Sequence, residues 1–302
     1  MDGVLVVNKP AGLTSHDVVN RVRRILRQRA IGHLGTLDPM ATGVLPLIIG
    51  RMTRLAQFYS ASEKTYEGVI RFGFATDTYD AEGEPSSPAQ PVKVTLEELK
   101  RAAACFVGRI QQTPPPFSAK KVQGVPAYKL ARKNKAVELK PVEVEVKEFE
   151  LSDWDGEYAA FRAHVASGTY MRSVAHDMGQ QLGCGAHLAR LRRTHVAEFS
   201  LELAHALDEL EAAAEANRAD ELFVNPRLVL PGFPSVTVTE EVAARIRNGR
   251  TVNLPELSRA RQVKVFRGQR ELLAVATRIA GTLFHPGVVL MTQTPTAAVY
   301  GR

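Results

Sequence analysis

Alternating apolar and polar side chains predict β-strands in three segments of the chain. The pattern is clearest over residues 66–74, where Tyr, Gly, Ile, Phe and Phe share one face and Glu, Val, Arg and Gly share the other. Shorter alternating segments cover residues 142–147 and 161–165. Because successive side chains of a strand point to opposite faces, each segment can bury one face and expose the other.

Other segments place apolar residues at helical spacing. Residues 15–30 do so, with a threonine or serine available as the cap and an apolar face made of Val18, Val19, Val22, Ile25 and Leu26. A second helix is expected from Met171 to Gly183, since glycine readily closes a helix. A third, acidic helix is expected over residues 204–216.

The order of these elements predicts a fold class and two domains. Strands and helices intermix without the regular βαβ rhythm of a parallel sheet, which favours a mixed α/β (α+β) core for residues 1–230. The sequence Pro-Gly-Phe-Pro at 231–234 is typical of a linker. Residues 235–302 then form a small C-terminal β-barrel, with a helix near 240–248 and strands at 262–266, 271–278 and 288–291.

Length and composition are those of a folded protein of about two domains. The 302 residues are 45% hydrophobic and 24% charged. Two cysteines are too few for a disulfide framework and fit a reducing compartment. The N-terminal apolar run is only four residues long, and no stretch reaches the ~20 apolar residues of a membrane helix. We therefore expect a cytoplasmic protein with no membrane association.

Positive charge is concentrated in particular parts of the chain. Of a net charge of +7, residues 235–302 carry +6, from ten Lys and Arg against four Glu, so they form a candidate polyanion-binding unit. The helix at 15–30 carries five arginines opposed only by Asp17. Three prolines at 114–116 favour an extended arm over about 111–137, and residues 118–137 hold six cations and no acid. The sequence leaves two interpretations of this arm open: it contacts phosphates, or it is a solvated loop.

Motifs for common cofactors and metals are absent. The chain has neither a dinucleotide fingerprint nor a phosphate loop. Its histidines are scattered, and the pair Cys184 and His187 lacks the second pair that zinc needs. An acidic loop with Asp77, Asp80, Glu82 and Glu84 does not match calcium-loop spacing, which favours a solvated turn. We therefore expect no cofactor and no metal.

The strongest local signal surrounds a single acid. Asp38 is the only carboxylate between Ile31 and Gly50, in a segment rich in glycine and apolar residues. The proline after it restricts its backbone to extended geometry and so fixes where the carboxylate points. One aimed carboxylate suits covalent catalysis better than glycoside hydrolysis, which usually pairs two. A turn-capping aspartate remains the alternative.

Residues 32–46 resemble the catalytic loop of the TruB family of tRNA pseudouridine synthases. They match every specified position of its pattern G-H-x-G-x-L-D-P-x-A-T-G-x-L-P. Five further segments resemble family motifs in the right order, which makes the resemblance specific over most of the first 230 residues. These segments are 8–15, 64–66 with 76–83, 115–119, 167–173 and 187–193. The stretch after residue 230 resembles the family's PUA-type RNA-binding domain much more loosely.

The resemblance implies a role for each matched residue. Asp38 would be the nucleophile, attacking either ribose C1′ or uracil C6, and Arg172 would keep it ionised and aimed. Tyr66 would stack on the uracil and take the proton lost from the sugar; without the family it would be a core aromatic. Substrate binding would fall to His33, Tyr170, Leu191 and Lys9, with Lys120, Lys121 and Arg132 on the arm.

The implied activity is isomerisation of uridine to pseudouridine at position 55 in the TΨC loop of tRNA, after the base is flipped out. We expect tRNA as the partner, no obligatory protein partner and a monomer. Three alternatives stay open. A guide-RNA-dependent, dyskerin-like synthase shares the aspartate loop. A non-catalytic RNA-binding protein would not need Asp38, Tyr66 and Arg172 together. A base-releasing glycosidase would need a second acid, for which Asp80 is the loop candidate.

Overall fold

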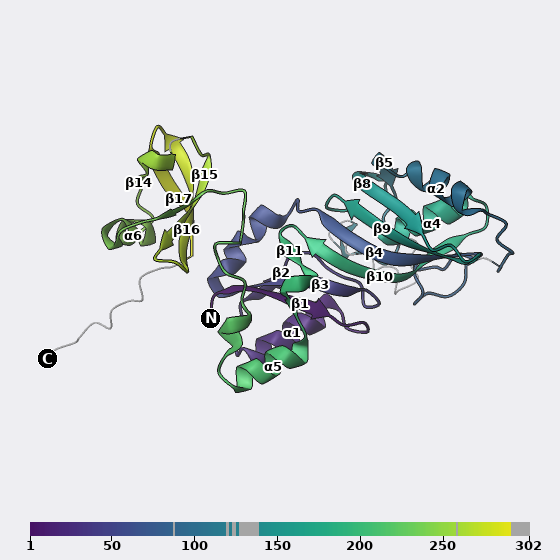
Figure 1. Cartoon of the computed structure of the whole chain (residues 1–302), viewed down its shortest axis with the longest axis horizontal. Helices are drawn as coiled ribbons and strands as arrows, with labels where there is room; N and C mark the ends of the chain where they lie inside the picture. The colour runs from purple at the N-terminus through teal and green to yellow at the C-terminus, as the bar shows by residue number, and fades with distance from the viewer. Residues whose placement is uncertain (87, 119–120, 123–124, 127–138, 258, 291–302) are drawn as a thin grey trace.

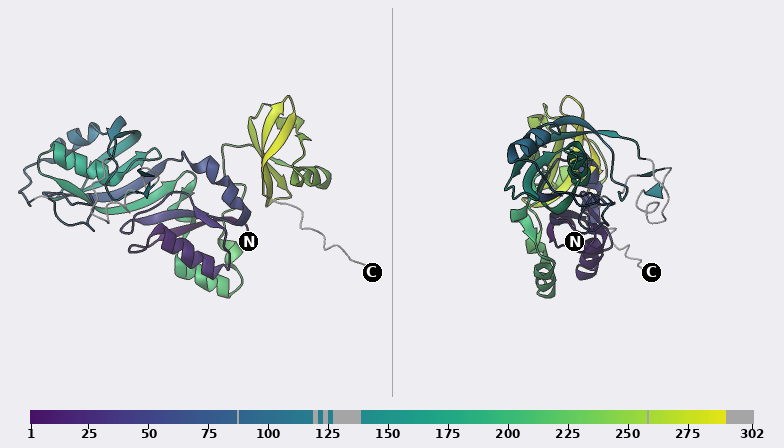
Figure 2. Two further views of the ribbon diagram at one scale, coloured as in Figure 1. Left: turned by 180° about the vertical axis from the view of Figure 1, so that it is seen from behind. Right: turned by 90° about the vertical axis from the view of Figure 1, so that its right-hand side faces the viewer.

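Two sheets, joined by residues 231–234, organise the computed structural model (Figure 1). The structure describes residues 1–290 except 87, 119–120, 123–124, 127–138 and 258. Figure 2 shows the smaller C-terminal sheet at one end of the molecule, beyond the N-terminal part of the large sheet. The mixed α/β class expected from the sequence is confirmed.

The large sheet brings the N-terminal strands and the central strands of the chain together. Its order is β12 (Ala204–His205), β1 (Gly3–Lys9), β3 (Thr42–Ile49), β10 (Ala186–Val196), β4 (Lys64–Phe72), β9 (Tyr158–Val165), β8 (Val142–Ser152) and β5 (Gly108–Gln112). β2 (Ile31–His33) pairs with β3, and β11 (Phe199–Ser200) pairs with β10. A separate hairpin joins β6 (Lys121–Val122) and β7 (Val125–Pro126).

The parallel pairing of β3 with β10 sits at the centre of this sheet. It aligns Arg192 with Thr42 and Arg193 with Gly43. The 32–46 loop thus ends beside a strand that lies some 150 residues later in the sequence. On the other side of β10, antiparallel pairing places Tyr66 opposite Arg193. The pairing of β3, β10 and β4 therefore brings Gly43, Arg193 and Tyr66 side by side.

Helices cover the large sheet and bury its apolar side chains. They are α1 (Ser15–Ile25), α2 (Leu96–Ala104), α4 (Met171–Gln181) and α5 (Leu207–Glu215), with short 3₁₀ segments η1 (Gly50–Tyr59), η2 (Leu201–Leu203) and η3 (Ala219–Leu222). A capping box starts α1, where the Thr14 hydroxyl accepts from the Asp17 amide and the Asp17 carboxylate accepts from the Thr14 amide. The apolar face expected for this helix is buried, including Val18, Val19 and Val22.

Two helix boundaries differ from the sequence-based expectation. α1 ends at Ile25 and not near residue 30, because Arg27 adopts a positive φ of 48° that a helix cannot continue through. α5 begins at Leu207 and not at 204, because Ala204 and His205 pair with β1 as a strand. The helix expected to end at Gly183 is confirmed, with Gly183 at a φ of +73°.

The C-terminal unit is a curled sheet of five strands. Its order is β13 (Ser235–Thr237), β15 (Gln262–Arg267), β16 (Glu271–Ala280), β17 (Leu283–Val289) and β14 (Val252–Asn253), with α6 (Glu240–Arg247) and η4 (Pro255–Leu257) beside them. The last strand starts at Leu283 and not at 288. In the sequence, Pro286 argues against a strand because proline lacks an amide donor. The register shift between the pairs of His285 and Val288 puts Pro286 in a bulge, where a strand tolerates proline.

The C-terminal sheet packs against the segment that leads to it. Phe266, Leu272 and Val275 belong to one buried apolar cluster with Val224 and Val229. The fully buried Lys264 ammonium donates to the carbonyls of Arg227 and Val229, at 2.8 and 2.7 Å. Removing this sheet would therefore expose apolar surface and leave two carbonyls unpaired.

Candidate active site

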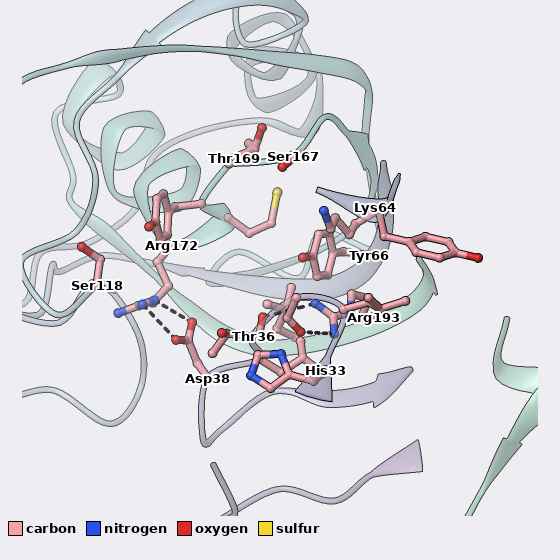
Figure 3. A pocket seen from close by; sticks show the side chains of 18 of the residues that line it. His33, Thr36, Asp38, Lys64, Tyr66, Ser118, Ser167, Thr169, Arg172 and Arg193 are labelled. Atoms are coloured by element: carbon pink, nitrogen blue, oxygen red, sulfur yellow. Dashed lines mark hydrogen bonds and ion pairs between the residues drawn. The ribbon is translucent and has the colours of Figure 1, made fainter. Parts of the chain in front are cut away.

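One cavity collects most of the side chains that the sequence singles out (Figure 3). Its volume of about 370 Å³ is in the range of small-ligand sites. It lies where the 32–46 loop, the start of β4, the start of α4 and β10 meet. His33, Asp38, Tyr66, Tyr170, Arg172 and Leu191 all line it, together with Lys64, Ser118 and Arg193.

Asp38 is held by a buried arginine at the start of α4. The Arg172 Nε lies 2.9 Å from Asp38 Oδ2, and Nη2 donates to Oδ1 at 3.0 Å. The arginine side chain is only 5% exposed, whereas that of Asp38 is 33% exposed and faces the cavity. Arg172 is itself fixed, since it also donates to the carbonyls of Phe117 and Thr78, at 3.0 and 3.3 Å.

A second carboxylate lies behind this pair. Asp80 Oδ2 is 3.6 Å from Arg172 Nη1, and the Asp80 side chain is 5% exposed. The expectation that Asp80 lies in a solvated turn is therefore wrong: its Oδ1 accepts from the Thr78 hydroxyl and the Glu82 amide, which folds the loop inward. Burial raises the pKa of Asp38; the Arg172 charge opposes that rise and the Asp80 charge adds to it.

The backbone around Asp38 is anchored from two other elements. The Ser15 hydroxyl of α1 donates to the Leu37 carbonyl at 3.1 Å and accepts from the Leu37 amide at 2.8 Å. The Lys9 ammonium donates to the Pro39 carbonyl at 3.1 Å. These bonds fix the residues on either side of Asp38, so the carboxylate is aimed before substrate arrives.

Lys9 and Arg193 occupy positions that sequence reasoning did not foresee. Lys9, expected among the substrate-binding residues, is fully buried and does not line the cavity, and burial lowers its pKa to about 8. Arg193 is 1% exposed and donates to the carbonyls of Gly35, Thr36 and Val44. The sequence feature that points to Arg193 is its position two residues after Leu191, which puts both side chains on the same face of β10.

The remaining expected residues fall in three places. Lys120 and Arg132 lie outside the described residues, and for Lys121 only the backbone of β6 is described. On α1, Arg21 is not free for phosphate, because Asp208 and Glu211 of α5 pair with it at 2.6 and 2.7 Å. Within α1, only Asp17 opposes the arginine charges of the helix, but Asp208 and Glu211 of α5 add two more acids.

Neither a metal site nor a membrane span is found in the described part of the chain. No group of three or more His, Cys, Asp or Glu side chains there could hold a metal ion. No helix among the described residues is long and apolar enough to cross a membrane.

Replacement of Arg172 by lysine tests the geometry of the pair. A lysine keeps the positive charge but loses the planar fork that reaches both oxygens of Asp38. For the activity that the sequence resemblance implies, we expect a large fall in the single-turnover rate and little change in RNA affinity. A collapse of affinity with the rate preserved would instead make Arg172 a phosphate contact.

The fold matches that of solved structures over nearly the whole chain. The crystal structure titled as a Cbf5-Nop10-Gar1 complex aligns with a TM-score of 0.70, over 96% of this chain and 85% of that chain, at 24% identity. A second structure, titled as an H/ACA RNP bound to a substrate RNA containing 2′-deoxyuridine, aligns with a TM-score of 0.71 at 23% identity, over 96% and 85%.

Sequence comparison gives the family. Residues 23–171 match the TruB family pseudouridylate synthase N-terminal domain, and residues 172–231 match the tRNA pseudouridylate synthase B C-terminal domain. Relatives named tRNA pseudouridine synthase B include one from Solibacter usitatus, 52% identical over 96% of this chain and 100% of the relative. Another, from Geobacter sulfurreducens, is 42% identical over 82% of each chain. The chain belongs to the TruB family of pseudouridylate synthases.

Proposed function

We propose that this protein isomerises uridine 55 in the TΨC loop of tRNA to pseudouridine. The observation that carries the proposal is the Asp38–Arg172 pair in a cavity also lined by Tyr66. The names of the relatives support tRNA as the substrate class. Position 55, the flipped base and the role of each side chain belong to the proposal.

Asp38 acts as the nucleophile. Its carboxylate attacks ribose C1′ or uracil C6, the C1′–N1 bond breaks, the uracil turns, C1′ joins C5, and the bond to Asp38 breaks again, which restores the carboxylate. The uracil leaves C1′ with the electron pair of the C1′–N1 bond and uses an electron pair at C5 to form the new bond. C5 loses its proton and N1 gains one, so no cofactor, oxidant or reductant is consumed. Arg172 keeps the carboxylate ionised and oriented, which opposes the rise of the Asp38 pKa on burial.

Tyr66 and Leu191 form the place for the uracil. Tyr66 is 8% exposed with its ring at the cavity, and Leu191 lines the same space from β10. A uracil can reach them only after leaving the RNA stack, which costs a few kcal/mol. Phosphate contacts from the basic arm and from the C-terminal unit offset that cost.

We favour the stand-alone tRNA enzyme over a guide-RNA-dependent synthase. The relatives at 42–52% identity are named tRNA pseudouridine synthase B, whereas the likeness to Cbf5 is at 24% identity and concerns the fold. The paired Asp38 and Arg172 also weigh against a non-catalytic RNA-binding protein. We further propose a monomer in the cytoplasm with a catalytic domain over 1–230 and a PUA-like domain over 235–302.

Position-resolved mapping of pseudouridine in unmodified tRNA tests the proposal. The purified chain, incubated with a tRNA transcript alone, should convert uridine 55 and no other uridine. Conversion that requires an added guide RNA would favour the guide-dependent alternative. Absence of pseudouridine under both conditions would reject the activity.

Exposed arginines of the C-terminal unit should contribute affinity and not chemistry. Because Glu240 and Glu271 pair with Arg247 and Arg267, the cations available for RNA are others, and we select the exposed Arg259, Arg261 and Arg278. Replacing all three by glutamine should weaken tRNA binding and make its log–log salt slope shallower, by about 0.7–0.9 per lost phosphate contact. Salt titrations measure this, and an unchanged slope would contradict an RNA-binding role for this face.

A further inference from the structure

A second pair of cations lines the cavity, apart from the Asp38–Arg172 pair. Figure 3 shows Lys64 and Arg193 to the right of the cavity and the Asp38–Arg172 pair to the left. The two cations meet at Gly35: a Cβ built there would lie 3.5 Å from Arg193 Nη1 and 3.6 Å from Lys64 Cε. They therefore approach one another across a glycine that has no side chain to separate them.

Among the residues that the structure describes, neither of these cations has an acidic partner in the cavity. Asp38 is the only acid among the described residues that line it, and Arg172 binds that acid. Arg193 directs its donors to three backbone carbonyls. The Lys64 ammonium donates to the Ser62 carbonyl, which uses one of its three donors. Lys64 thus has donors left for a ligand.

This arrangement is costly while the cavity holds no anion. Burial, and then the nearby Arg193 charge, lower the pKa of Lys64 to about 8, so the lysine remains charged at neutral pH. An anion bound to the lysine would offset the repulsion by Arg193 and accept hydrogen bonds from the unused lysine donors. A flipped nucleotide brings such an anion, because one phosphodiester precedes it and another follows it.

We propose that Lys64, with the Arg193 charge behind it, binds one of the two phosphodiesters that flank the target uridine. The inference rests on the function proposed above. Lys64 and Tyr66 lie two residues apart on β4 and share a face, about 7 Å apart along the strand. That spacing suits a uracil on Tyr66 with its sugar–phosphate backbone beside Lys64. Lys64 is accordingly a binding residue that positions the nucleotide for Asp38.

Neutral linkages in a stem-loop RNA test this assignment. One RNA carries a methylphosphonate 5′ to the target uridine and another carries it 3′, each with a 2′-O-methyl group on the ribose preceding the linkage. Charged RNAs with the same 2′-O-methyl groups are the references. Binding affinity and its salt slope are measured for the wild type, Lys64→Gln, Lys64→Arg and Lys100→Gln. Lys100 lies on α2 outside the cavity, so Lys100→Gln is the matched control for loss of a charge.

The Lys64→Gln variant should bind the charged RNAs roughly tenfold more weakly than wild type, with a salt slope about 0.7 shallower. Lys64→Arg and Lys100→Gln should each stay nearer to wild type. One neutral linkage should weaken RNA binding by the wild type by a similar factor. The same linkage should not weaken RNA binding by Lys64→Gln any further, because both changes remove the same contact.

Three results would overturn the assignment: unchanged affinity in Lys64→Gln, losses that multiply at both linkages, or a loss confined to the rate at saturation, which would indicate a uracil contact. If the Lys64→Gln variant unfolds at a lower temperature than wild type, the wild-type protein alone provides the test. Equal wild-type affinity for the charged and neutral RNAs would then reject a phosphate contact. Failure of the proposed function has a different signature, namely no pseudouridine in the unmodified stem-loop with wild type.

Discussion

Replacement of Asp38 by asparagine should abolish pseudouridine formation while tRNA still binds within several-fold of the wild-type affinity. Asparagine has nearly the same shape and can still accept a hydrogen bond from Arg172, but its amide oxygen is too weak a nucleophile to form the covalent intermediate. Under the proposed function, we expect the phosphate contacts that dominate affinity to lie away from Asp38. Single-turnover assays on unmodified tRNA, together with equilibrium binding, measure both quantities.

A matched control comes from the neighbouring acidic loop. Asp77 is exposed, and among the described residues its carboxylate accepts a hydrogen bond from the backbone amide of Glu84. Asp77→Asn should therefore turn over substrate at close to the wild-type rate. Conversion by Asp38→Asn at a rate like that of this control would remove Asp38 from its assigned role.

Local pattern and motif were enough to predict much of the fold. The alternation over 66–74 corresponds to β4, in which Tyr66, Ile70 and Phe72 are buried. The spacing after Met171 corresponds to α4. Boundaries failed where a local event overrides periodicity, as at Arg27 with its positive φ and at the bulge that holds Pro286. Such events depend on single backbone angles and strand register, which hydrophobic pattern does not encode.

The candidate site was predictable only as far as its motifs reach. Asp38, Tyr66 and Arg172 come from separate segments, and their convergence follows from β10 inserting between β3 and β4, which no local pattern specifies. Asp80 looked like part of a solvated turn because its partner, Arg172, is distant in sequence. Charge counting along α1 failed for the same reason, since the acids that neutralise Arg21 lie on α5.

Arg193 is the clearest case of a residue whose importance is visible only in three dimensions. A charged side chain is rarely fully buried unless its donors are satisfied. Here Nε, Nη1 and Nη2 donate to the carbonyls of Val44, Thr36 and Gly35, all within the 32–46 loop that carries Asp38. The arginine therefore joins β10 to this loop, which Ser15 and Lys9 anchor at other residues.

Replacement of Arg193 by methionine should lower the free energy of unfolding by roughly 3 kcal/mol or more, because each unpaired buried carbonyl costs about 1–3 kcal/mol. Methionine fills much of the same space without supplying any donor, so the loss reports on the hydrogen bonds more than on packing. The neighbouring Arg192 points to the exposed side of β10, and Arg192→Met is the matched control, with an effect within about 0.5 kcal/mol. Denaturant unfolding of both variants gives the comparison. Equal stabilities would show that the three carbonyls find other partners and that Arg193 does not hold the Asp38 loop in place.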